Sequence, residues 1–216
     1  MTTNTVTKYL KFANVQMAAE SYYLKAAGEW AVADARQNIS GNDLKDALVD
    51  GNKRALKFTP ALATDFTKYW KIVEHKANTG TGFSGTLFQA IADNADMGIK
   101  ANELVLSFRS TEFADDAVRD NQATNKMEVT EFGFAIGQIA DTEDWFQTLR
   151  TRALIGDDAK LSVTGYSLGG HLANTKGQSQ IVLRGAYMNE RSDSMEKKST
   201  PTPGAHIVGT QTELRQ

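Results

Sequence analysis

The chain contains no cysteine, and only three histidines and three prolines occur among its 216 residues. The absence of cysteine excludes disulfide bonds, thiolate catalysis and cysteine-ligated metal sites. With only His75, His171 and His206 available, few side chains can serve as a general base, and we expect neither a metal nor a cofactor. No apolar run approaches the ~20 residues of a membrane-spanning helix, and the polar start lacks a signal-peptide core. We therefore expect a protein of the cytoplasm, or one exported by a leaderless route.

The chain also has little net charge, because 24 basic residues nearly balance 26 acidic ones and leave a formal net charge of −2. No basic field exists to hold nucleic acid, so we expect no nucleic-acid partner. Hydrophobic residues make up 41% of the chain and charged residues 23%, a mixture typical of globular proteins. The length suits one α/β domain.

The spacing of apolar residues predicts both helices and strands. Helices are expected over residues 8–27, 43–56 (with Asn42 or Asp43 as cap) and 134–152, and strands over 83–91, 103–109 and 161–165. The first two strands would form an antiparallel hairpin across a polar turn at residues 93–96, for which we favour a plain turn over a cation site. Glu74 and His75 lie in a lysine-bearing segment, and we expect a solvated histidine there.

The composition changes after Ala173. All ten phenylalanines and all three tryptophans precede it, whereas two of the three prolines follow it. The last segment has little apolar surface to bury. We therefore expect an α/β domain over residues 1–173 and a loosely ordered tail over residues 174–216.

Residues 165–169 read GYSLG, a G-x-S-x-G pattern that directly follows an expected strand. A serine on a sharp strand-to-helix turn needs small neighbours, because the strand and the helix approach each other closely. The turn exposes the hydroxyl of Ser167 and points the helix N-terminus at a developing oxyanion. The alternative interpretation is a glycine-rich turn without chemistry.

Three motifs resemble the class 3 (fungal-type) lipase family of the α/β hydrolases. Residues 163–173 (VTGYSLGGHLA) are similar to the family's V-T-G-H-S-L-G-G-A-L-A, with Tyr166 in place of histidine. Residues 104–111 (LVLSFRST) resemble its strand ending in F-R-G-T or F-R-G-S, with Ser110 in place of glycine, and residues 133–134 match its G-F. The resemblance implies an α/β-hydrolase-like central sheet flanked by helices, with Ser167 as nucleophile and the backbone N–H groups of Thr111 and Leu168 as the oxyanion hole.

The family pattern breaks after the nucleophile. A hydroxyl nucleophile needs a base and an orienting acid, which follow in the order Ser, Asp or Glu, His in α/β hydrolases. Downstream of Ser167 the only aspartate is Asp193 and the only histidines are His171 and His206. The order Ser167, Asp193, His206 is therefore formally present, but it leaves no room for the strands that the family places between these residues. We therefore expect a fold that is incomplete at its C-terminal side, from a truncated or altered C-terminus, and keep Asp193 and His206 as weak candidates for acid and base.

These observations favour a carboxylic-ester hydrolase of the lipase or esterase kind that acts through an acyl-serine intermediate, with a phospholipase among the options. Its partner would be a small-molecule or lipid ester, and transient contact with lipid interfaces stays open. A catalytically weak or inactive hydrolase-like module is the alternative, and an acyltransferase that uses the same serine is a third. Two interpretations of residues 113–119 also stay open, a short amphipathic lid helix and an exposed connector.

Overall fold

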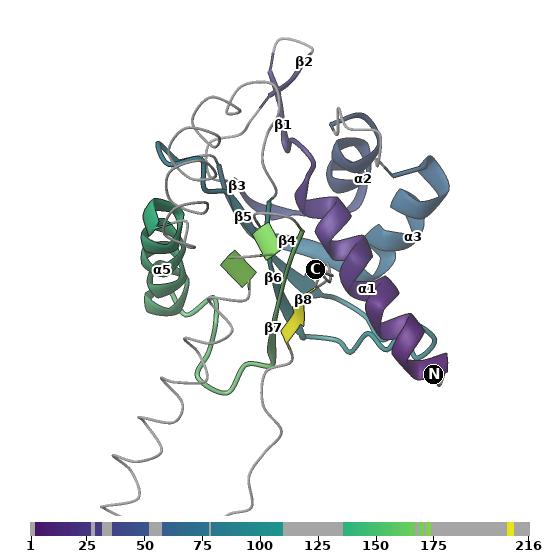
Figure 1. Ribbon diagram of the computed structural model, residues 1–216. Coiled ribbons are helices and arrows are strands. Elements are labelled where there is room, and N and C mark those ends of the chain that lie inside the picture. Colours follow the sequence, from purple (N-terminus) through teal and green to yellow (C-terminus); the bar gives the residue numbers. More distant parts are fainter. Residues whose placement is uncertain are drawn as a thin grey trace, which may run out of the picture.

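The protein is an α/β structure built around one mixed sheet (Figure 1). The computed structural model describes residues 3–26, 29–31, 36–51, 58–77, 79–109, 136–166, 169–170, 172–173 and 207–209. The helices are α1 (Thr3–Ala19), α2 (Gly41–Asp50), α3 (Pro60–Tyr69) and α5 (Ile136–Thr151). The strands are β1 (Leu24–Ala26), β2 (Glu29–Ala31), β3 (Arg36–Ile39), β4 (Trp70–Lys76), β5 (Gly85–Ala90), β6 (Leu104–Phe108), β7 (Leu161–Gly165) and β8 (Ile207–Gly209).

The sheet combines an antiparallel half with a parallel half. Its strand order is β3-β4-β5-β6-β7-β8, and the pairs from β3 to β6 are antiparallel. The pairs β6–β7 and β7–β8 are parallel. A parallel pair requires a crossover connection, and α5 lies in the connection between β6 and β7. Strands β1 and β2 form a separate antiparallel hairpin.

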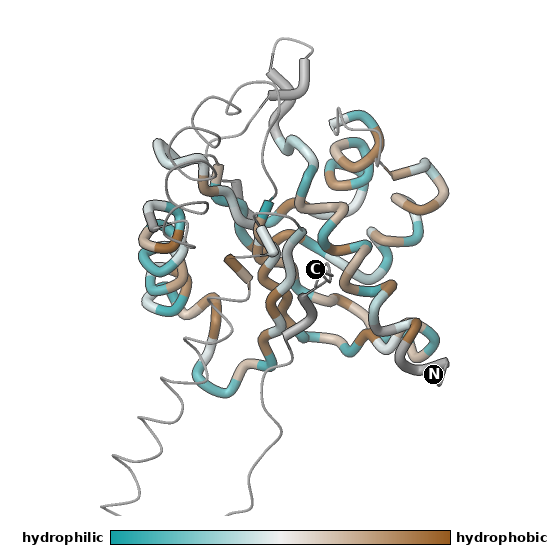
Figure 2. Tube along the Cα trace, in the orientation of Figure 1, coloured by the Kyte–Doolittle hydropathy of each residue, from teal (hydrophilic) through white to brown (hydrophobic). Residues whose placement is uncertain are grey.

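Helices cover both faces of this sheet (Figure 1), and hydrophobic residues gather along the central strands between them (Figure 2). On the α1 face, apolar residues of α1, α2 and α3 pack with Ile72, Phe88 and Val105. On the α5 face, Trp145, Phe146 and Leu149 pack with residues of β5, β6 and β7. Burial on both faces is the pattern of an α/β layer structure. Within the described ranges, no helix is both long and apolar enough to span a bilayer.

The expected hairpin, the expected strand at residues 161–165 and the helix before that strand are confirmed. The expected strands 83–91 and 103–109 correspond to β5 and β6, which pair antiparallel from Gly85↔Phe108 to Gln89↔Leu104. The expected helix 134–152 corresponds to α5, which packs on the sheet. The expected strand 161–165 matches β7.

The boundaries of the first two helices were wrong. Helix α1 ends at Ala19 rather than at residue 27, because tight backbone bonds close it and the Tyr22 N–H then donates to the Gly51 carbonyl at 2.8 Å. Helix α2 begins at Gly41 with Ser40 as its N-cap, since the Ser40 carbonyl accepts from the Leu44 N–H. Asn42 and Asp43 lie inside that first turn, and residues 52–57 lie outside the described residues.

Candidate active site

Strands β6 and β7 end side by side at one edge of the sheet. Their parallel register pairs Ser107 with Thr164 and Phe108 with Gly165. The segments that leave β6 and β7 therefore start from the same edge, the carboxyl edge. In open α/β sheets, ligands bind outside the carboxyl ends of the strands. The two motifs, at residues 104–111 and 163–173, therefore both reach this edge of the sheet.

Two glycines let three backbone segments meet at this edge. A Cβ atom on Gly165 would lie 2.0 Å from the carbonyl oxygen of Gly169. A Cβ atom on Gly169 would lie 2.3 Å from the Phe108 carbonyl oxygen and 2.7 Å from that of Arg109. Contacts this short exclude any side chain at either position. Residues 169–170 and 172–173 are helical, so the chain passes from a strand to a helix within the few residues expected for a nucleophile elbow.

The predicted site residues themselves lie outside the described residues: Ser167, Leu168, Thr111, Asp193 and His206. The flanking residues are described, and the structure brings the Phe108–Arg109 end of β6 against Gly169. Tyr166, which precedes Ser167, is 60% exposed. Ile207, which follows His206 in the chain, pairs with Val163 as the first residue of β8. The segment at 113–119 and the rest of the predicted tail also lie outside the described residues.

The expectation of a solvated His75 was wrong. Its ring is fully buried in β4, where Nδ1 forms a 2.9 Å hydrogen bond with Thr86 Oγ1. The ring also packs edge-on against Tyr23 at 4.8 Å between centroids. The neighbouring Glu74 is buried too, and it accepts hydrogen bonds from Trp145 Nε1 and from Arg152. A register shift in β4 between Ile72 and Glu74 accompanies this placement of the two residues on opposite faces of the sheet.

His75 stands in a row of buried polar residues that crosses the α1 face. Successive strand pairs align His75 with Thr86, Thr86 with Ser107, and Ser107 with Thr164. Paired residues point to the same face of a sheet. All four are less than 5% exposed. Three strand spacings separate His75 from β7, about 14 Å at the usual spacing between strands, which is too far for His75 to take a proton from a serine at the elbow.

The C-terminal half of α1 supplies polar groups that sequence analysis missed. The side chain of Gln16 is 7% exposed, and its Nε2 donates to the Phe108 carbonyl at 3.2 Å and to Glu20 Oε1 at 2.9 Å. Its Oε1 accepts from Ser107 Oγ at 2.7 Å. Spacing along α1 gave no signal for the contact with β6, because Ser107 and Phe108 lie about 90 residues away in the sequence.

Arg109 and Tyr23 complete the buried polar layer. Arg109 is 5% exposed, and its Nη2 donates to the Glu20 carbonyl at 3.2 Å. Its guanidinium carbon lies 4.5 Å from the centre of the Tyr22 ring. The Tyr23 hydroxyl donates to the Ala18 carbonyl. Burial raises the pKa of the Tyr23 hydroxyl well above its ordinary value, although the positive charge of Arg109 acts in the opposite direction.

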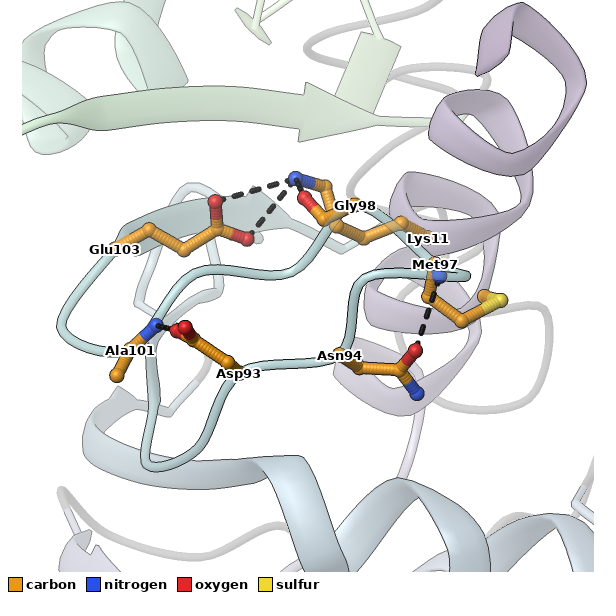
Figure 3. A network of polar contacts seen from close by, with 7 residues as sticks. All are labelled: Lys11, Asp93, Asn94, Met97, Gly98, Ala101 and Glu103. Atoms are coloured by element: carbon orange, nitrogen blue, oxygen red, sulfur yellow. Dashed lines mark hydrogen bonds and ion pairs between the residues drawn. The ribbon is translucent and has the colours of Figure 1, made fainter. Parts of the chain in front are cut away.

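The polar turn at residues 93–96 caps its own loop (Figure 3). Asn94 Oδ1 accepts from the Met97 N–H at 3.1 Å, and Asp93 Oδ1 accepts from the Ala101 N–H at 2.7 Å. Asn94 and Ile99 form an isolated antiparallel bridge. The expected turn is present. Within the described part of the chain, no group of three or more acidic or histidine side chains is arranged to hold a metal ion.

Comparison of the chain with protein-family models, with curated proteins and with solved structures finds no match. Its function is therefore inferred from its own residues and their geometry.

Proposed function

We propose that the protein is a serine hydrolase that cleaves carboxylic esters, with small-molecule or lipid esters as substrates and Ser167 as the nucleophile. The observation that carries this proposal is the backbone contact at the carboxyl edge. Gly165 meets Gly169, and Gly169 meets the carbonyl oxygens of Phe108 and Arg109. A G-x-S-x-G turn needs this contact, whereas a glycine-rich surface turn does not.

The strand arrangement supports a finer proposal, that the sheet is of the α/β-hydrolase type and that the chain is similar to class 3 lipases. The strand that ends in Phe-Arg runs parallel to the elbow strand and is its direct neighbour. The connection between them carries a helix on one face of the sheet. The motifs at residues 104–111 and 163–173 therefore leave the sheet at the same edge.

In the proposed reaction, the Ser167 hydroxyl attacks the ester carbonyl and forms a tetrahedral intermediate. The backbone N–H groups of Leu168 and Thr111 stabilise its oxyanion, and one such donor contributes ~3–4 kcal/mol to transition-state stabilisation. Collapse of the intermediate expels the alcohol and leaves an acyl-serine, which water then hydrolyses. The short path from β6 and β7 to Thr111 and Ser167 starts at one edge of the sheet, which supports this pairing of roles.

The general base is the open part of this mechanism. His75 is the only histidine in the described part of the chain, and it is buried three strands from β7. His75 therefore does not serve as the base, and the short stretch after Ser167 has no room for the strands that the lipase family places before its acid and its histidine. That spacing favours a second candidate function, a hydrolase-like module with little or no turnover. Asp193 and His206 remain the proposed acid and base of an active enzyme.

A fluorophosphonate probe distinguishes the two functions. We expect the folded protein to be labelled at Ser167 and to hydrolyse activated short-chain esters weakly, because an oxyanion hole without a triad retains ~10³–10⁴-fold catalysis over water. Ser167→Ala should abolish both signals. Peptide mapping after labelling identifies the residue, and circular dichroism checks that the variant is folded.

Two results would change this assignment. A folded wild-type protein that is not labelled would establish the silent module in place of the enzyme. A loss of turnover of about 100-fold or more in a folded His206→Ala variant would make His206 the base, because that loss matches general-base catalysis.

A further inference from the structure

We propose that Gln16 is a positioning residue for the oxyanion hole, an inference that rests on the proposed function. Its amide holds the end of β6, from which the chain runs on to Thr111. The proposal concerns a residue of α1, far from both motifs in sequence, and it assigns a role to the buried polar layer under the carboxyl edge.

Both the nitrogen and the oxygen of the Gln16 side-chain amide form hydrogen bonds. Its two N–H groups go to the Phe108 carbonyl and to Glu20 Oε1, and its oxygen accepts from Ser107. The side chain is thus fixed by three bonds inside a buried site. A buried amide with fewer partners would cost stability, so the satisfied arrangement strongly favours one geometry.

The Phe108 carbonyl couples Gln16 to the elbow. The same oxygen that accepts from Gln16 lies against Gly169, where a Cβ atom would approach to 2.3 Å. A shift of this carbonyl must therefore move the helix start after Ser167, or open a gap between the two segments. The Gln16 bond sets the position of the oxyanion strand relative to the nucleophile turn.

Arg109 adds a second tie between the same elements. Its guanidinium donates to the Glu20 carbonyl and lies over the Tyr22 ring, both just beyond the C-terminal end of α1. Gln16 and Arg109 thus tie two successive residues at the end of β6, Phe108 and Arg109, to the C-terminal end of α1. Oxyanion donors act only within a few tenths of an ångström of their target, so this restraint bears on the transition state.

Lys11 offers a matched control at the other end of β6 (Figure 3). It is also 7% exposed, and it ties α1 to Gly98 and Glu103 through Nζ contacts of 3.0 Å. Glu103 directly precedes β6, at the edge opposite the elbow. Loss of Lys11 therefore tests the effect of a broken tie to α1 without displacing the carboxyl edge.

The test compares Gln16→Met, Ser107→Ala and Lys11→Met with the wild-type chain. The fluorophosphonate labelling rate is measured, and ester turnover is normalised to the amount of Ser167 labelled at completion. We expect Gln16→Met to lower both the labelling rate and kcat about 10-fold with KM unchanged, because the displaced donors act only in the transition state. Ser107→Ala, which only frees the amide oxygen, should lower them about threefold.

Lys11→Met should lower the melting temperature but leave normalised kcat within about twofold of wild type. A fall in Lys11→Met equal to that in Gln16→Met would overturn the proposal, since any loosening of α1 would then suffice. Unchanged rates in Gln16→Met would overturn it as well. If Gln16→Met does not fold, Ser107→Ala decides by the same criterion. An unlabelled, folded wild type would reject the proposed function and this inference together, whereas equal labelling of wild type and variants rejects the inference alone.

Discussion

The two faces of the central sheet are built from different chemistry. On the α5 face, Leu87, Leu106 and Val163 meet the aromatic and leucine side chains of α5. On the α1 face, apolar residues surround Phe88. Closer to the carboxyl edge, a row of buried polar residues runs across the strands from His75 to Thr164. Apolar contacts stabilise without a fixed direction, whereas hydrogen bonds fix distances and angles. The α5 face therefore contributes mainly stability, and the polar row at the carboxyl end of the α1 face fixes where the strands end.

This difference is largest beside the candidate site. The Phe108 side chain belongs to the apolar cluster of the α5 face, while its carbonyl oxygen accepts from Gln16 on the α1 face. A single residue thus joins both kinds of packing. Changes on the α5 face should lower stability more than catalysis per folded molecule, and changes near the carboxyl edge should do the reverse.

The largest loss of stability is expected from Phe146→Ala on the α5 face. Its side chain is 1% exposed in the cluster with Leu149 and Leu106. Truncation removes buried surface and leaves a cavity, at a cost of about 4 kcal/mol in the free energy of unfolding. Urea titration measures this cost. Ester turnover per labelled Ser167 should stay at the wild-type level, and a tenfold fall would show that the two faces do not divide their roles in this way.

Gly169→Ala tests the close backbone contact at the carboxyl edge of the sheet. The added Cβ would meet the carbonyl oxygens of Phe108 and Arg109, which belong to backbone and cannot move aside cheaply. We expect a loss of about 2 kcal/mol in stability, typical of overpacking, with loss of Ser167 labelling. Gly156→Ala is the control, because nothing lies within 4 Å of its Cβ position. Normal labelling of Gly169→Ala would contradict the close approach at the elbow.

The smallest effect is expected from Tyr23→Phe on the α1 face. It removes the hydroxyl bonded to the Ala18 carbonyl, at a cost of about 1 kcal/mol near neutral pH. The pKa of Tyr23 is raised in the folded protein, so its contribution is complete below the ordinary tyrosine pKa of about 10 and is lost as pH rises above it. Above that pH the group subtracts about 1.4 kcal/mol per pH unit from wild-type stability.

The stability difference between wild type and Tyr23→Phe should therefore shrink as pH rises above about 10. Urea unfolding at a series of pH values follows it, and a constant difference would show that another group sets the alkaline limit.

Sequence patterns predicted the core of the sheet because their signals are local. A window of a few residues is enough to recognise the apolar runs in β6 and β7 and the apolar face of α5. The unit formed by α3 and β4 went unpredicted, although Thr59 caps α3, accepting from the Leu62 N–H, and Pro60 occupies its first turn. Strand β4 carries Glu74, His75 and Lys76 next to a register shift, and this pattern masks a buried strand.

The burial of His75 and the hydrogen bonds between Gln16 and β6 could not be predicted, for a different reason. Their partners come from other elements: Thr86 from the next strand, and Ser107 and Phe108 from β6. A polar residue with such partners has the same local sequence as a solvated one. The close approach at Gly165 and Gly169 was predictable, because the G-x-S-x-G pattern itself implies it.

The long connection between β6 and β7 also bears on how the protein folds. Strands β4, β5 and β6 pair with neighbours in the chain, whereas β7 begins at Leu161, after the segment that contains α5. Closing this long connection costs conformational entropy, which only contacts formed later in folding offset. Strand β7 should therefore join the sheet late. Pulse-labelling hydrogen exchange would then protect amides of β4 to β6 before those of β7, and early protection of β7 would refute this order. If β7 joins late, the candidate site is completed only at the end of folding. A chain that fails to finish folding would then lack the site but keep the paired strands β4 to β6.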